Sequence, residues 1–95
     1  MKNETIFKHK IQKILKEIPD LWFVKIQMVS VRGIPDLLIC HKGRFIAFEL
    51  KVGDNDLDPL QDHILTRINK AGGIALELTP DNYKEVFDEL FLLGE

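Results

Sequence analysis

The chain has 95 residues, of which 45% are hydrophobic and 29% charged, a composition typical of one globular domain over residues 1–95 and not of a disordered chain. It contains no apolar run near the ~18 residues of a membrane span, no secretory signal at its start, and a single cysteine that excludes internal disulfides and thiolate zinc clusters, so we expect an intracellular, cytoplasmic protein with no membrane partner. The net charge of −2 conceals a basic first half, since residues 1–51 hold ten Lys and Arg against five Asp and Glu, a balance that suits a nucleic-acid partner or simply keeps the surface soluble.

The first predicted element is a helix that begins at Asn3, its N-cap, and runs to about Ile18, where Pro19 ends it. Its apolar residues recur at the helical period. The lysines, Lys8 among them, mostly fall outside that stripe, where they would be solvated or would contact phosphate. Glu4 lies in the first turn, where the helix dipole favours a carboxylate.

A strand is predicted from Trp22 to Val29, because large apolar side chains there alternate with others at period two. The loop that follows contains Arg32 and Gly33 just before Asp36. These two residues could approach a phosphate backbone, and a plain turn explains them equally well. Both interpretations therefore stay open at this point.

The next two strands, Leu37–His41 and Arg44–Val52, flank Lys42-Gly43, which predicts a β-hairpin with a two-residue turn. Both strands are apolar on both faces. Such strands must be covered on both sides, which indicates a layered α/β fold. In that setting we expect Cys40 to be a small buried hydrophobe and not a nucleophile.

The hairpin register brings charged residues together. If His41 and Arg44 close the turn, Asp36 lies directly across from Glu49, and Lys51 projects from the same face. Opposed like charges destabilise a strand pair unless a cation lies between them, and Mg²⁺ is a cation that carboxylates hold. The alternative is that both acids are solvated at strand ends, with Lys51 as a salt-bridge partner.

After the hairpin, Asp58 is predicted to cap a helix in which Gln61 completes a capping box, and the helix ends at Gly72-Gly73. Ile74–Leu78 is then a short strand that returns parallel to the preceding one by a right-handed crossover. Thr79-Pro80-Asp81 precedes a last amphipathic helix. The predicted order is α-β-β-β-α-β-α, with a mixed four-stranded sheet flanked by helices.

The series formed by Glu4, Gly33-Ile34-Pro35-Asp36, Glu49-Leu50-Lys51 and Leu57-Asp58-Pro59-Leu60-Gln61 resembles the virus-type replication-repair nuclease (VRR-NUC) domain of the PD-(D/E)XK superfamily over nearly the whole chain. The resemblance implies a restriction-endonuclease-like α-β-β-β-α-β core with a C-terminal helix. It also implies that Gln61 belongs to the active site and that Glu4 is an outer metal ligand or a partner of the metal's water.

We therefore expect a metal-dependent DNA endonuclease in which Asp36, Glu49 and the backbone carbonyl of Leu50 hold Mg²⁺ or Mn²⁺. Lys51 would orient the attacking water or stabilise developing charge. Arg32, Gly33 and Lys8 are the candidate nucleic-acid contacts. The competing hypotheses are a non-catalytic nucleic-acid-binding or assembly module with the same fold, and a hydrolase that acts on a nucleotide.

The small size of the chain leaves little room for base-reading elements, so cleavage selected by DNA structure is expected. By resemblance to stand-alone VRR-NUC proteins, the substrate would be a four-way junction or other branched DNA, cut by a homodimer. Candidate interface residues are Trp22, Phe23 and the apolar segment Phe91-Leu92-Leu93.

Overall fold

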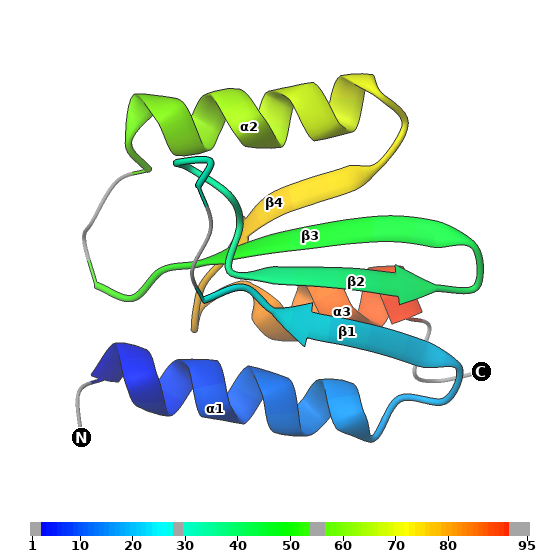
Figure 1. The fold of residues 1–95 in the computed structure, drawn as a ribbon. Helices are drawn as coiled ribbons and strands as arrows, with labels where there is room; N and C mark the ends of the chain where they lie inside the picture. Colours follow the sequence, from blue (N-terminus) through cyan, green and yellow to red (C-terminus); the bar gives the residue numbers. More distant parts are fainter. Residues whose placement is uncertain (1–2, 28–29, 54–56, 92–95) are drawn as a thin grey trace.

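The computed structural model describes residues 3–27, 30–53 and 57–91, and its elements follow the predicted order (Figure 1). These elements are helix α1 (Asn3–Lys16), strands β1 (Leu21–Lys25), β2 (Leu37–His41) and β3 (Arg44–Leu50), helix α2 (Pro59–Lys70), strand β4 (Ile74–Leu78) and helix α3 (Tyr83–Phe91). Within the described part of the chain, no helix is long and apolar enough to cross a membrane.

The four strands form one mixed sheet in the order β1-β2-β3-β4, in which β4 is parallel to β3 and the other pairs are antiparallel. Lys42 and Gly43 both have positive φ, at 51° and 81°, as the predicted two-residue turn requires. His41 pairs with Arg44, and Leu37 pairs with Phe48. The predicted hairpin register is therefore confirmed.

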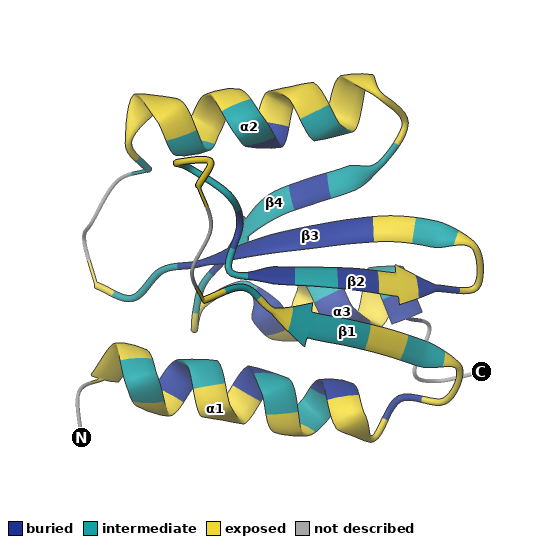
Figure 2. Cartoon of the chain, in the orientation of Figure 1, coloured by how far each residue is buried: buried dark blue, intermediate teal, exposed yellow. Residues whose placement is uncertain are grey.

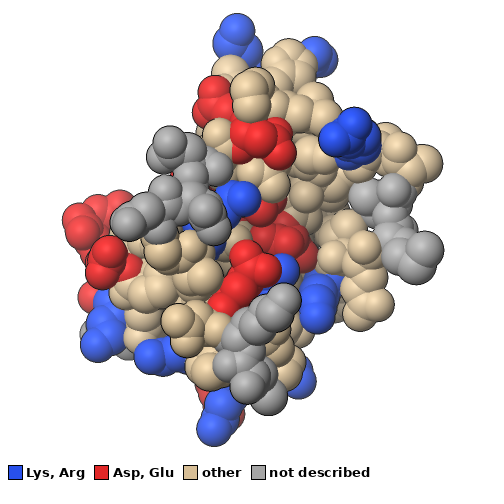
Figure 3. Space-filling view, turned by 90° about the vertical axis from the view of Figure 1, so that its left-hand side faces the viewer, with Lys and Arg blue, Asp and Glu red and all other residues tan. Residues whose placement is uncertain are grey.

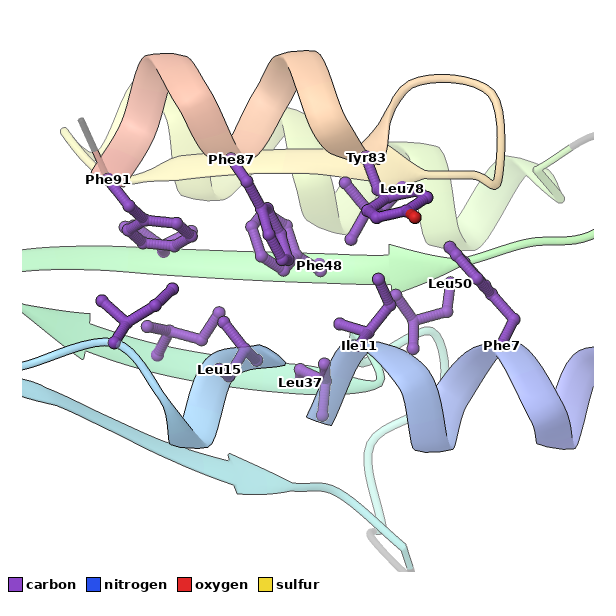
Figure 4. Close-up of a cluster of buried hydrophobic side chains, with 13 residues drawn as sticks. Phe7, Ile11, Leu15, Leu37, Phe48, Leu50, Leu78, Tyr83, Phe87 and Phe91 are labelled. Carbon is purple, nitrogen blue, oxygen red and sulfur yellow. The ribbon is translucent and has the colours of Figure 1, made fainter. Parts of the chain in front are cut away.

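Helices cover both faces of the sheet, with α2 on one side and the α1–α3 pair on the other (Figure 1). The larger core lies under the α1–α3 pair (Figure 4) and its buried side chains are Phe7, Ile11, Leu15, Ile18, Leu37, Ile39, Ile46, Phe48, Leu50, Leu78, Tyr83, Phe87 and Phe91. Phe48 stacks on Phe87 at the centre of this core, with ring centroids 5.8 Å apart. A smaller cluster of Ala47, Leu65 and Ala75 lies under α2. The layered α/β arrangement is as predicted.

The ends of three elements differ from prediction. Helix α1 begins at Asn3 itself and ends at Lys16, short of Ile18. The N–H groups of Glu17 and Ile18 bond three residues back, to Ile14 and Leu15, because Pro19 disfavours helical geometry in the residue before it. Strand β1 runs over Leu21–Lys25, with residues 28–29 of the prediction outside the described part, and β3 ends at Leu50 rather than at residue 52.

The prediction that Cys40 is buried is wrong, because its side chain is exposed. Cys40 pairs with Trp22 on one side and with Phe45 on the other, so these three residues form a row across the α2 face of the sheet. The α2 cluster is centred farther along β3, on Ala47. Trp22 is consequently 63% exposed and Phe45 46% exposed. Figure 2 shows exposed bands on β1, β2 and β3.

The residues predicted to form a dimer interface fall into three groups. Trp22 is exposed, whereas Phe23 is half-buried against the larger core. Phe91 is buried in that core, so its side chain is not available to an interface. Its ring packs edge-on against Phe87 and His41. Residues 92–93 lie outside the described part of the chain.

Candidate functional site

The site begins with Asp36, which lies immediately before β2 and continues the hairpin register toward Glu49. Its main chain is held by the Ile26 N–H, which donates to the Asp36 carbonyl at 2.9 Å. Its side chain is held by the Leu50 N–H, which donates to Oδ2 at 2.8 Å. One hydrogen bond to the main chain and one to the side chain therefore fix Asp36, and the predicted approach of Asp36 to the Glu49-Leu50 segment is observed.

Glu49 faces α2 and is buried, with only 5% of its surface exposed. Burial, and secondarily the negative charge of Asp36, raises the pKa of Glu49 from 4.5 to about 8, while Lys51 and Lys8 partly oppose the shift. The side chain is therefore mostly neutral at pH 7. A cation beside both acids would favour the charged form instead, which is the property expected of a carboxylate pair that holds a metal ion.

Two lysines bracket the two acids. Lys51 Nζ lies 3.9 Å from Glu49 Oε2, so the predicted contact on the shared face is present. Lys8 reaches from α1 and places its Nζ 3.5 Å from Asp36 Oδ1 and 3.8 Å from Glu4 Oε2. Figure 3, in which the left-hand side of Figure 1 faces the viewer, shows acidic and basic side chains mixed at the centre of that face. Glu4 is therefore linked to Asp36 through the ammonium group of Lys8.

Gln61 makes both of the contacts for which the sequence offered separate explanations. Its Oε1 accepts from the backbone N–H of Asp58 at 3.2 Å and completes the capping box of α2. Its Nε2 donates to Glu49 Oε2 at 3.2 Å. Because an amide has separate donor and acceptor ends, one side chain can fix the start of α2 and orient Glu49 together.

Arg32 and Gly33 lie beside Asp36 around a hollow of about 510 Å³, whose other lining residues include Ile26, Gln27 and Val31. Gly33 has φ +84°, and an added Cβ would lie 2.9 Å from Leu60 Cγ. Glycine is therefore needed there to let the loop pack against the first turn of α2. Arg32 is exposed at the rim of the hollow, as a contact to a phosphate backbone would require.

The donor atoms available to a metal ion are few. Among the residues that the structure describes, no group of three or more His, Cys, Asp and Glu side chains is arranged to hold one. The Leu50 N–H donates to Asp36 Oδ2, and because the N–H and C=O of one strand residue face the same neighbouring strand, we expect the Leu50 carbonyl on that side as well. Such a set suits Mg²⁺, which completes its shell with water and substrate phosphate.

One acid near the site was not singled out from the sequence. Glu77 on β4 aligns with Glu49 in the parallel register and projects from the same face of the sheet. It is half-buried, and its carbonyl accepts from Asn82 Nδ2 at 3.0 Å. The signal that could have found it is the register of β4 against β3, because the sequence predicts the parallel pair but not which residues align.

The described residues thus bring together two carboxylates, two ammonium groups and one amide at the end of the β2–β3 hairpin. Lys8 comes from α1, where it also pairs with Glu4, and Gln61 comes from α2, so these two helices and the β2–β3 hairpin build the site. In comparisons with known proteins, no family model, no curated protein and no solved structure matches this chain.

Proposed function

We propose that this protein is a metal-dependent endonuclease that hydrolyses DNA phosphodiester bonds. The single observation that carries the proposal is the convergence of Asp36, Glu49 and Lys51 beside one buried strand end. A buried carboxyl whose pKa is raised to about 8, first by burial and then by the charge of Asp36, is costly for a purely structural sheet. The cost is understandable if the acids exist to hold a cation.

In this proposal Asp36 and Glu49, with the Leu50 carbonyl, hold Mg²⁺ or Mn²⁺. When bound, the ion would supply Lewis-acid polarisation of the phosphate and help to activate a water as nucleophile. Lys51, held against Glu49, orients the attacking water or stabilises the charge that develops on the phosphate. Gln61 keeps Glu49 in place through its 3.2 Å hydrogen bond. Arg32 and the Gly33 backbone contact the DNA backbone beside Asp36.

The resemblance to VRR-NUC domains supports the same function and extends it. The element order and the mixed sheet suit a restriction-endonuclease-like core followed by helix α3. We infer from the resemblance that the substrate is a four-way junction or other branched DNA and that two copies act together. The exposed Trp22 is the described residue that best suits such an interface.

The test is cleavage of four-way, flapped, linear and single-stranded DNA with Mg²⁺ or Mn²⁺. Asp36→Asn should abolish cleavage, because it removes the charge while leaving an oxygen to accept from the Leu50 N–H. Lys51→Ala should abolish it as well. The matched controls are Asp88→Asn and Lys70→Ala, exposed residues of the same types near the C-terminal ends of α3 and α2. Cleavage retained in Asp36→Asn or Lys51→Ala contradicts the proposal.

A second candidate is a nucleic-acid-binding or assembly module without catalysis. It is favoured by the scarcity of metal donors among the described residues and by the neutral state of Glu49. This candidate predicts binding to branched DNA that does not depend on Mg²⁺ and no product with any of the substrates. A gel-shift assay in EDTA, run beside the cleavage assay, separates the two functions.

A further inference from the structure

Among the residues that the structure describes, Lys8 is the one charged side chain of α1 that forms an ion pair with Asp36. Helical periodicity places the lysines of this helix mostly toward solvent, yet the side chain of Lys8 is only 25% exposed. Its ammonium lies between two acids, 3.5 Å from Asp36 and 3.8 Å from Glu4. Lys8 therefore supplies positive charge at a place where the proposed function requires a metal ion.

The two lysines of the site are attached differently. Lys51 follows β3 and its backbone N–H donates to the Leu78 carbonyl at 3.0 Å, so its ammonium reaches Glu49 from a fixed strand end. Lys8 reaches Asp36 from a separate helix, by its long side chain alone. A flexible four-carbon stem can withdraw its ammonium by changing rotamers without moving the helix. Lys8 is also the more exposed of the two lysines, at 25% of its side chain against 17% for Lys51, so its ammonium can move away from its carboxylate toward solvent more readily.

We propose that Lys8 is an internal counter-ion of Asp36 that a divalent cation must displace, so that Lys8 weakens metal binding and sets the concentration at which the site fills. The inference rests on the proposed function, because it assumes that Asp36 is a metal ligand. Its physical basis is Coulombic: an ammonium near a carboxylate both satisfies the negative charge and repels an arriving cation. The displaced ammonium stays close to Glu4, whose carboxylate can retain it.

The experiment measures Mn²⁺ binding to the whole protein by isothermal titration calorimetry and by the loss of the free-ion electron paramagnetic resonance signal. Lys8→Met removes the ammonium while keeping a side chain of similar length. We expect its Kd for Mn²⁺ to be about two- to fivefold lower than that of wild type, the range of a partly exposed ion pair. Its melting temperature should also rise more than that of wild type at the same Mn²⁺ concentration.

Two control variants separate a local contact from a general change in charge. Lys13→Met removes the same charge from the same helix, but Lys13 is exposed and lies five residues on, on a different side of α1. Its Mn²⁺ affinity should match that of wild type, because salt screens distant surface charges. Lys8→Arg retains a cation that can pair with Asp36, so it should bind Mn²⁺ no more tightly than wild type.

Each outcome distinguishes the inference from the function on which it rests. Tighter binding in Lys8→Met alone supports the counter-ion role. Unchanged or weaker binding in Lys8→Met, or equal tightening in Lys13→Met, overturns that role and leaves the metal site standing. Absence of Mn²⁺ binding to wild type, with no difference in Asp36→Asn, overturns the proposed metal site and the counter-ion role with it.

Discussion

Replacing Glu49 with Gln tests the electrostatic description of the site by a measurement that needs neither DNA nor metal. Glu49 is 5% exposed, and its pKa in the folded protein is raised to about 8 by burial and by Asp36. In the unfolded chain the carboxyl loses its proton near 4.5. Between these two pH values unfolding releases a proton, so the free energy of unfolding falls as the pH rises from about 4.5 to about 8 and then levels off.

The magnitude follows from the same two values. The difference between 4.5 and about 8, at about 1.4 kcal/mol for each tenfold change, gives up to about 5 kcal/mol in total. About 4 kcal/mol of this loss falls between about pH 5 and about pH 9. Gln at this position imitates the protonated acid, because its amide can donate to Asp36 and its oxygen can accept from Gln61.

The assay is urea unfolding in EDTA at several pH values. Glu49→Gln should match wild type near pH 5 and exceed it by about 4 kcal/mol near pH 9, a midpoint difference of roughly 2–4 M urea. Glu85→Gln makes the same chemical change at an exposed position of α3 and should stay within about 0.5 kcal/mol of wild type throughout. Parallel stability curves for wild type and Glu49→Gln across this range would refute the reasoning.

Three further predictions likewise need neither DNA nor metal. Burial and nearby cations lower the pKa of His41 below 6.5. The stability that depends on neutral His41 should therefore be fully present above about pH 6.5 and be lost as the pH falls through the pKa of His41 in the folded protein. His41→Asn should remove this part of the acid destabilisation measured by urea unfolding. Gly33→Ala should lower the free energy of unfolding by about 1–3 kcal/mol more than Gly43→Ala, because both residues have positive φ but only a Cβ at Gly33 contacts Leu60. Equal losses of stability in the two variants would contradict the packing role of Gly33. Cys40 should react with a thiol reagent in the native protein, one thiol per chain, and a requirement for denaturant would contradict its exposure.

The sequence alone determined the parts of the site that depend on local pattern. A turn dipeptide between two apolar runs fixed the hairpin, and the period of two then aligned Asp36 with Glu49 and placed Lys51 on the same face. The capping residues around Asp58 likewise predicted the start of α2, and therefore the position of Gln61 in its first turn. Hydrogen bonds within a turn, a strand pair or a helix end act over a few residues, so the order of residues specifies them.

Tertiary packing decided the remainder, because it depends on how far each helix reaches and which way it is rotated. Alternation placed Cys40 on a covered face, but α2 covers only the part of the sheet around Ala47, so the thiol is exposed. The helical period predicted that Lys8 faces solvent, whereas the packing of α1 on the sheet brings its ammonium to Asp36. The raised pKa of Glu49 likewise depends on the burial that α2 and the neighbouring strands impose. A local pattern can list the charged groups of this site, but only the packed fold sets their distances and their exclusion from water.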